Sequence, residues 1–302
     1  MVSRAQDLQW RLEAVLFAGY FGLMRALPTD WASGLGAALL KTLGPLTGAH
    51  RTAERNLRLA FPEKDAAWRR RMLKAQWDNT GRTFAETPIL NRMTVASGRV
   101  ELVDPHGRLK ALADGAPPVV FVSGHFACFE IMPLVILEAG VPCQITYRAT
   151  NNPYVDRIIR DSRARYGVKL FAPKGAEGAR ELLDGLKRGE SAALMNDQKF
   201  NEGPEVLFFG KPVNAAPGPS RLAQRFGTVL QPMSVERIKG ARFRVVVHDP
   251  IPVPKTGDKA ADVAAATQAV TRFVEDQVRR RPEEWFWVHK RWPNAAYAAL
   301  EA

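Results

Sequence analysis

The sequence predicts an α/β fold, in which helices flank a mostly parallel, mixed sheet and a separate helical segment precedes it. From residue 100 onward, short runs rich in β-branched and aromatic residues alternate with longer helical patterns, which is typical of a parallel sheet with crossover helices. Before residue 49 the chain is rich in Ala, Leu and Gly and carries few charges. We therefore expect an N-terminal helical segment over residues 1–48 and an α/β domain over residues 49–302.

The individual elements are predicted from capping and breaking residues. Residues 50–60 and 65–83 are predicted as two helices, the first ended by Phe61-Pro62. A helix over residues 153–166 opens with Asn151-Asn152-Pro153, a cap with Pro in the first turn. The remaining helices are expected over residues 126–139, 175–187, 220–226 and 260–281, and strands over 119–122, 143–147, 168–171, 191–195, 206–213, 229–235 and 243–247.

The N-terminal segment has the composition of a helix that lies at a membrane surface. Residues 14–24 are uncharged and mostly apolar, with Trp10, Tyr20 and Phe21 within or beside them. This run is too short to cross a bilayer, which needs about 20 residues. Residues 31–46 carry only Lys41 and extend the apolar surface, so we expect a membrane-associating segment. A buried helix of a soluble protein is the alternative, and no cleavable signal peptide is expected.

The charge balance predicts an anionic partner. With 43 Lys and Arg against 31 Asp and Glu, the formal net charge is +12, which suits nucleic acid, an anionic membrane surface or an acidic protein. The sequence contains no nucleic-acid-binding motif, so lipid and an acidic carrier are favoured. The two cysteines, Cys128 and Cys143, make no disulfide framework, and the five histidines show no metal-ligand spacing. We therefore expect no metal site.

His125 is the first candidate catalytic residue. It follows the strand over residues 119–122 and the break at Ser123-Gly124, at the edge of the sheet where open α/β folds bind ligands. If the helix starts directly after His125, the turn folds the imidazole back toward Glu130. Glu130 would then fix the tautomer, and His125 would take a proton from a hydroxyl. A chance spacing of the two residues is the alternative.

Further candidates follow other strands at the same edge of the sheet. Arg148 follows the strand over residues 143–147 and either supports an anion or a developing oxyanion, or forms an ordinary salt bridge. Phe208 and Phe209 either line a groove for an acyl chain or pack in the core. The candidate catalytic residues are His125, Glu130 and Arg148, and the candidate substrate-binding residues are Asn152, Asp197, Gln198, Phe208 and Phe209.

Several short motifs occur in a specific order along the chain. The motifs are Arg55-Asn56-Leu57 with Phe61-Pro62, residues 125–130, Tyr147-Arg148 with Asn152-Pro153, Asp197-Gln198 with Gly203, Phe208-Phe209-Gly210, and residues 287–292. This order resembles that of the lysophospholipid acyltransferase superfamily and, within it, the lipid A biosynthesis acyltransferases, from about residue 50 to the C-terminus. Most of the superfamily has Asp where this chain has Glu130, whereas the lipid A branch commonly has Glu, and relatives often have Trp in place of Phe129.

The resemblance implies an integral or tightly bound inner-membrane enzyme that faces the cytoplasm. It would move an acyl chain from acyl carrier protein to a hydroxyl of a lipid A precursor, in lipopolysaccharide biosynthesis. No metal or organic cofactor is implied, because the thioester is already activated and needs only a base and support for the tetrahedral intermediate. His125 would be the base, Glu130 its orienter, and Arg148 or backbone N–H groups near Phe126 the oxyanion donors. The partners would be the carrier, the precursor glycolipid and the anionic membrane surface.

Other functions stay open on the sequence alone. A sister enzyme would use the same His125 and Glu130 to acylate a lysophospholipid, an ornithine lipid or a glycolipid. A non-catalytic protein would use the basic surface and the N-terminal helix to bind a membrane, and would keep its function after His125→Ala. A covalent acyl-enzyme through Cys128 is disfavoured, because the only base evident beside it is His125.

Overall fold

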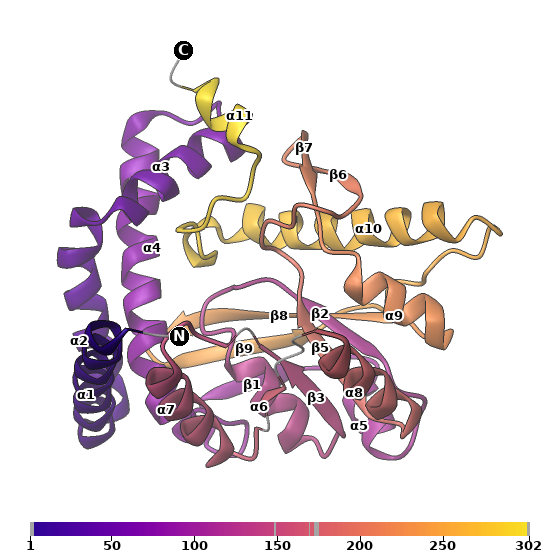
Figure 1. Cartoon of the computed structure of the whole chain (residues 1–302), viewed down its shortest axis with the longest axis horizontal. Coiled ribbons are helices and arrows are strands. Elements are labelled where there is room, and N and C mark those ends of the chain that lie inside the picture. Colours follow the sequence, from indigo (N-terminus) through magenta and orange to yellow (C-terminus); the bar gives the residue numbers. More distant parts are fainter. Residues whose placement is uncertain (1–2, 148, 169, 172–174, 301–302) are drawn as a thin grey trace.

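The computed structural model describes residues 3–147, 149–168, 170–171 and 175–300, so Arg148 lies outside the described residues (Figure 1). Its centre is a seven-stranded sheet in the order β1-β9-β8-β2-β5-β3-β4. Neighbouring strands are parallel except β8 and β9, which confirms the mostly parallel, mixed sheet. The strands are β1 (Val100–Val103), β2 (Val120–Ser123), β3 (Cys143–Thr146), β4 (Leu170–Phe171), β5 (Ser191–Met195), β8 (Leu230–Lys239) and β9 (Arg242–Val247).

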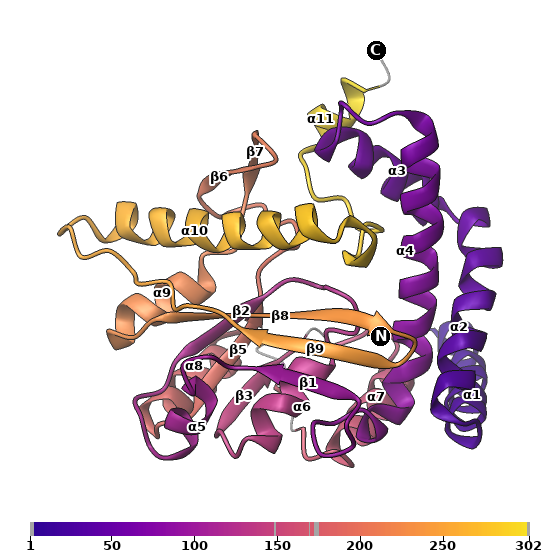
Figure 2. The same cartoon turned by 180° about the vertical axis from the view of Figure 1, so that it is seen from behind.

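Helices cover both faces of this sheet, and Figure 2 shows α10 on one side and α6 on the other. The central strand β2 is buried throughout, and its side chains alternate between the two cores. Val120 and Val122 pack in the cluster that contains residues of α9 and α10, whereas Phe121 packs in the cluster of α6. These helices are α5 (Arg108–Ala113), α6 (Ile131–Glu138), α7 (Pro153–Ala164), α8 (Gly175–Lys187), α9 (Gly218–Phe226) and α10 (Lys259–Arg280).

The N-terminal helices stand together at one end of the molecule (Figures 1 and 2). α2 packs along α4, where Gly36 and Gly81 let the two backbones approach so closely that a Cβ at Gly36 would lie 2.3 Å from the Gly81 carbonyl oxygen. α1 lies against α7. Within the described residues, no helix is both long and apolar enough to span a membrane. The helices are α1 (Arg4–Ala26), α2 (Thr29–Leu43), α3 (Gly48–Ala60) and α4 (Ala66–Glu86).

The segment after β5 differs from the prediction of one extended run over residues 206–213. It forms a hairpin of β6 (Glu205–Phe208) and β7 (Lys211–Asn214). Phe209 and Gly210 form its two-residue turn, with φ of +53° and +69°. Positive φ at both positions is the requirement of a type I′ hairpin turn, and Gly supplies it without strain at the second position.

The C-terminal segment returns from α10 to α3 with little regular structure before the short α11 (Asn294–Ala298). Its indoles are buried, and α3 holds its backbone: Asn56 Nδ2 donates to the carbonyls of Trp287 and His289, at 2.6 and 2.7 Å. The Asn56 amide oxygen accepts a hydrogen bond from the Tyr297 hydroxyl. The motif around Asn56 therefore anchors the segment that carries His289, and its role is structural.

Candidate active site

The register of two neighbouring strands brings His125 and Asp197 together. β2 and β5 are parallel, and Ser123 lies opposite Met195. His125 and Asp197 each come two residues later, at the carboxyl ends of their strands, which is where open α/β sheets bind ligands. The two side chains therefore meet at one edge of the sheet, although 72 residues separate them along the chain.

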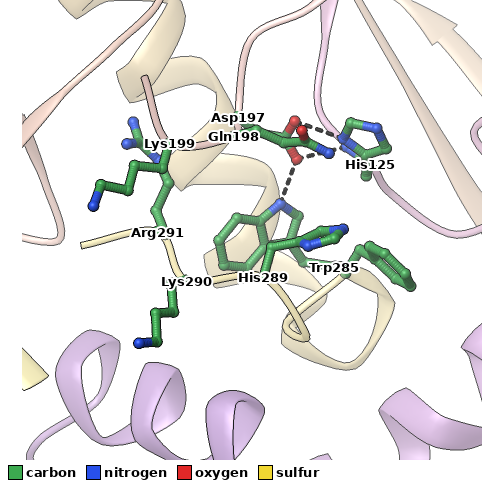
Figure 3. A pocket seen from close by; sticks show the side chains of 9 residues that line it. His125, Asp197, Gln198, Lys199, Trp285, His289, Lys290 and Arg291 are labelled. Atoms are coloured by element: carbon green, nitrogen blue, oxygen red, sulfur yellow. Dashed lines mark hydrogen bonds and ion pairs between the residues drawn. The ribbon is translucent and has the colours of Figure 1, made fainter. Parts of the chain in front are cut away.

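The carboxylate of Asp197 contacts both the side chain and the backbone of His125 (Figure 3). His125 Nδ1 lies 2.7 Å from Asp197 Oδ1, and the His125 backbone N–H donates to Oδ2 at 2.8 Å. The indole N–H of Trp285 also donates to Oδ2, at 2.7 Å. Because the carboxylate takes Nδ1, the neutral imidazole carries its proton there and leaves the Nε2 lone pair for a substrate. No described residue hydrogen-bonds Nε2.

The pair has the electrostatics of a base held by a buried carboxylate. Burial alone would lower the pKa of His125, but the charge and hydrogen bond of Asp197, aided by the charge of Glu130, raise it above the ordinary value of 6.5. Burial would likewise raise the pKa of Asp197, and the contacts with His125 and Trp285 instead hold it at about 2. Asp197 therefore stays ionised and favours the imidazolium form of His125.

Glu130 does not take the position beside His125 that the sequence predicted for it. Its carboxylate is paired with Arg163 on α7. The expected helix over residues 126–139 begins only at Ile131, and the chain before it is irregular, with Ala127 at φ +40°. The imidazole is therefore not folded back onto Glu130. Its orienting partner is Asp197, which the sequence had suggested only as a substrate-binding residue.

The backbone N–H groups next to His125 are also not available as oxyanion donors. The N–H of Phe126 donates to the Gly124 carbonyl, and that of Ala127 donates to the Glu284 carbonyl, both at 2.9 Å. A different donor emerges from the structure, because Arg163 Nε is buried without a hydrogen-bond partner among the described residues. The sequence offered no motif around Arg163, and its only signal was a basic residue on an amphipathic helix.

An apolar cavity of about 290 Å³ opens beside His125. Helix α1 supplies one wall through Phe17, Tyr20 and Phe21, and α4, α7 and the loop after His125 supply the others. Burial raises the pKa of Tyr20 to about 12, so its side chain stays neutral and presents mainly its ring. Polar lining residues include Glu130, Arg163, Gln198 and His289. The cavity is thus mainly apolar, with a few polar groups near His125, as ligand sites generally are.

Three predicted substrate-binding residues are placed elsewhere by the structure. Phe208 and Phe209 are buried and do not line the cavity; Phe208 packs against Trp285 and Trp292, so both rings belong to the aromatic core. Asn152 caps α7 and its Nδ2 donates to the Trp10 carbonyl, which fixes α1 to α7. Gln198 does line the cavity next to His125.

Cys128 has the properties of a core residue. Its side chain is fully buried, and burial, reinforced by nearby carboxylates, raises the pKa of the thiol well above its ordinary range. A thiol in that state is a poor nucleophile. Among the described residues, no group of His, Cys, Asp and Glu is arranged to hold a metal ion.

A histidine held by a buried carboxylate, at the edge of a mostly parallel sheet and beside an apolar cavity, is an arrangement suited to an α/β enzyme that activates a hydroxyl. Comparison with known protein families shows which family of enzymes the chain belongs to. Residues 6–294 match the model of the bacterial lipid A biosynthesis acyltransferase family. The chain belongs to that family and is an acyltransferase.

Individual relatives are distant but matched over most of their length. The lipid A biosynthesis lauroyltransferase of Escherichia coli (strain K12) is 24% identical over 288 residues, which cover 90% of this chain and 89% of the relative. The lipid A biosynthesis palmitoleoyltransferase of the same organism is 24% identical over 247 residues, covering 79% and 77%. A phosphatidylinositol mannoside acyltransferase of Mycobacterium tuberculosis (strain CDC 1551 / Oshkosh) is 23% identical over 286 residues, covering 87% and 88%.

Proposed function

We propose that this protein transfers a fatty acyl chain from acyl carrier protein to a hydroxyl of a lipid A precursor. The observation that carries the proposal is the His125–Asp197 pair at the mouth of an apolar cavity. The cavity would hold the acyl chain, and the imidazole would stand where the thioester and the acceptor hydroxyl meet. The family supports the class of reaction, and lipid A as the acceptor is suggested by two relatives that are named as lipid A biosynthesis enzymes.

In the proposed mechanism His125 acts as a general base. Its Nε2 takes the proton of the acceptor hydroxyl while the hydroxyl oxygen attacks the thioester carbonyl carbon. The negatively charged Asp197 stabilises the imidazolium that forms. The tetrahedral intermediate then collapses, the carbon–sulfur bond breaks, and the imidazolium returns its proton to the departing thiolate. An acyl-enzyme is not needed, in keeping with the buried and unreactive Cys128.

Two arginines are candidates to stabilise the negative charge of the intermediate. Arg163 lines the cavity, and its unpaired Nε offers a donor in a site of low exposure. Glu130 would act by holding this guanidinium in place. Arg148, expected from the sequence just after the strand over residues 143–147, is the second candidate, for the intermediate or for a phosphate of the acceptor.

We further propose that the enzyme works on the inner membrane, with the catalytic domain facing the cytoplasm, where it would meet the acidic carrier. α1 exposes one apolar face and α2 a second. Exposed apolar patches of this kind mark sites that contact a membrane or another protein. The net charge of +12 favours both an anionic membrane surface and an acidic carrier protein. The exposed apolar residues are Leu8, Leu12, Val15, Leu16 and Leu23 on α1, and Trp31, Leu35, Leu39 and Leu43 on α2.

A different glycolipid acceptor is the second candidate. The relative named as a phosphatidylinositol mannoside acyltransferase aligns with most of this chain, at an identity similar to that of the lipid A enzymes. The same His125 and Asp197 would serve either acceptor, because the base needs only a hydroxyl. The lauroyl or myristoyl chain length is likewise a proposal, since the named relatives differ in the chain they transfer.

Purified enzyme in detergent should transfer the acyl group from lauroyl and myristoyl carrier protein to a lipid A precursor, and mass spectrometry of the product identifies chain and position. His125→Ala should lose about 10²–10⁴-fold in rate, the usual contribution of a general base. The exposed His106 gives a matched control, since His106→Ala should keep full activity. If the enzyme acylates a phosphatidylinositol mannoside and not the lipid A precursor, the acceptor is the second candidate rather than the first. Retention of more than half the turnover in His125→Ala would show that the proposed base is wrong.

A further inference from the structure

α10 covers one face of the sheet in two different ways along its length (Figure 2). In its first half, Val263, Ala266 and Val270 pack in one apolar cluster with Val120 and Val122 of β2. Toward its C-terminus the same helix faces β8 and β9, and a hollow of about 230 Å³ lies between the helix and these two strands. The helix therefore forms a core in its first half and leaves an open space beside its last turns.

The hollow has a polar lining because of the side chains that β8 and β9 turn toward α10. Successive side chains of a strand point to opposite faces of the sheet. On β9, Phe243 and Val245 pack in the core that contains α6, whereas Arg244 and, directly after the strand, His248 line the hollow. Ser234 of β8 lines it as well. Packing alone would favour apolar residues on a sheet face that a helix covers.

The charged residues around the hollow leave one cation without a partner. Its lining contains three arginines and two glutamates: Arg244, Arg280, Arg281, Glu236 and Glu284. Glu236 is paired with Arg244 at 2.9 Å. Glu284 is paired with Arg281 at 2.6 Å. Among the described residues, no hydrogen bond or ion pair engages Arg280, and its side chain is exposed, so an anion can reach it from solvent.

Neutral hydrogen-bonding groups lie in the same hollow as this guanidinium. Ser234 Oγ and His248 Nε2 are 2.7 Å apart, and Nδ1 of the ring has no partner within the described part of the chain. Burial, together with the nearby charge of Arg280, lowers the pKa of His248, so the ring is neutral at pH 7. The side-chain amide of Gln277 forms no hydrogen bond to any described residue. The hollow thus offers neutral donors and acceptors beside a free cation.

The hollow is separate from the apolar cavity of the candidate active site, although the two share a wall. Glu284 is the one described residue that lines both spaces. Phe126 lines the hollow, whereas His125 and Ala127 on either side of it line the apolar cavity. A ligand in the hollow would therefore not occupy the space proposed for the acyl chain.

We propose that this hollow binds a small, water-soluble phosphomonoester, with its phosphate at Arg280 and its hydroxyl groups against Gln277 and His248. An unpaired guanidinium favours an oxyanion, which it binds through charge-assisted hydrogen bonds. The volume of about 230 Å³ is far larger than the roughly 15 Å³ that one water needs, so it has room for a sugar phosphate or a glycerol phosphate. The polar lining suits a hydroxylated body and not an alkyl chain. This site goes beyond the proposed acyl transfer.

Binding is measured by isothermal calorimetry on the full-length protein in non-ionic detergent, with inorganic phosphate, glycerol 3-phosphate, glucose 1-phosphate and uncharged glucose as probes. One of the two organic phosphates should bind more tightly than inorganic phosphate, and glucose should not bind. Arg280→Gln should weaken the best probe by roughly tenfold, the equivalent of one charge-assisted hydrogen bond. Gln277→Leu keeps the size of the side chain and should weaken the organic phosphates more than inorganic phosphate.

Two control variants show where the probe binds. Arg272→Gln is the matched control, because Arg272 is also an exposed arginine of α10 and does not line the hollow. His125→Ala should bind the probes as tightly as the wild type, because His125 lines the other cavity. Loss of binding in His125→Ala, with binding kept in Arg280→Gln, would place the phosphate in the candidate active site and overturn the proposal.

Three other results would also overturn the proposal. The first is that no phosphate probe binds in the millimolar range, and the second is that Arg280→Gln and Arg272→Gln bind alike. The third is equal affinity for inorganic phosphate and both organic phosphates, which would reject the hydroxylated body. Arg280 has no hydrogen bond to lose, and melting temperatures confirm that its variant is folded. Because no acyl transfer is measured, the result does not depend on the proposed function.

Discussion

Asp197 determines how His125 can act, because it contacts both the imidazole and the backbone of the same residue. The backbone hydrogen bond fixes the loop, the side-chain bond fixes the tautomer, and Trp285 fixes the carboxylate itself. Because both of its oxygens accept hydrogen bonds, the carboxylate is held in one orientation. In the proposed mechanism the imidazole is therefore preorganised before any substrate arrives, which would lower the cost of reaching the transition state.

The His125–Asp197 pair predicts a specific pH dependence. Because Asp197 raises the pKa of His125, kcat/KM should rise with pH through an apparent pKa above 6.5, as the imidazolium loses its proton and becomes a base. Asp197→Asn removes the charge that raises the pKa of His125, while the burial that lowers this pKa remains. The rising limb of the profile should therefore move to lower pH. The rate at the optimum should fall roughly 10²–10⁴-fold, because the asparagine no longer stabilises the imidazolium.

Asp249→Asn is the matched control for that profile, because Asp249 is an exposed carboxylate paired with another histidine, His106. It should leave the rate and the profile unchanged. An Asp197→Asn enzyme whose rising limb stays where the wild-type limb lies would show that the carboxylate does not act through His125.

The sequence predicted His125 at this edge of the sheet with Glu130 as its partner, whereas in the structure the imidazole is paired with Asp197. The strand, the break and the histidine are all local features, so they can be predicted from a single stretch. The partnership with Asp197 depends on β5 lying next to β2, which is a property of strand order that neither stretch contains. The position of Glu130 was misjudged because the positive φ of Ala127, and the hydrogen bond from its N–H to the Glu284 carbonyl, leave no trace in the local pattern.

At the scale of elements, α1 has two apolar faces with different surroundings. One face turns Phe17, Tyr20 and Phe21 into the cavity, and the opposite face exposes a stripe that includes Leu16, 75% exposed. Polar contacts with α7, such as the hydrogen bond from Tyr154 to Asp7, hold the helix in place. The N-terminal helix therefore forms a wall of the candidate active site, which goes beyond the membrane attachment expected from the sequence.

The inner face of α1 should influence which acyl chain is accepted. Phe17→Ala enlarges the cavity, so in competition between carrier proteins with different acyl lengths the enzyme should shift toward longer chains. One methylene in an apolar pocket is worth about 1–3 kcal/mol of discrimination, or roughly 10–200-fold. Leu16→Ala lies one residue away on the outer face and should leave the chain preference unchanged. An unaltered preference in Phe17→Ala would mean that the chain lies elsewhere.

The packing of α2 on α4 predicts a contrast between two glycines of one helix. A Cβ at Gly36 would lie 2.3 Å from the Gly81 carbonyl oxygen, whereas a Cβ at Gly34 would meet nothing within 4 Å. Gly36→Ala should therefore lower the free energy of unfolding by about 1–3 kcal/mol, the usual cost of overpacking. Gly34→Ala should be neutral or stabilising by up to about 1 kcal/mol, because Ala favours the helix. Melting temperatures in detergent compare the two, and equal values would show that the helices are not in close contact.

At the scale of the whole molecule, the class of fold could be predicted while the position of the helices could not. Alternating strand and helix patterns are enough to predict an α/β protein, since each element has its own period. From the composition of residues 1–48 we predicted a helical segment that associates with a membrane. The composition could not show that Ser33 donates to the buried Glu86, or that Glu86 pairs with Arg237 of β8. These contacts join α2 to the sheet through α4, and they depend on the complete fold.

The arrangement of charge and apolar surface leads to the last prediction, on membrane attachment. Leu16 and Trp31 are 75% and 72% exposed on α1 and α2, and Figure 1 shows both helices together at one end of the molecule. Apolar insertion is insensitive to salt, whereas attraction of basic residues to anionic lipid is screened within about 10 Å at 0.1 M. In a flotation assay with anionic vesicles, the wild-type protein should stay bound in high salt. The double variant Leu16→Glu/Trp31→Glu should be released by salt, because only the charge attraction remains. Leu207, 55% exposed on β6 away from these helices, provides the control: Leu207→Glu should float like the wild type. Complete release of the wild-type protein by salt alone would show that the basic surface, and not the apolar faces of α1 and α2, carries the attachment.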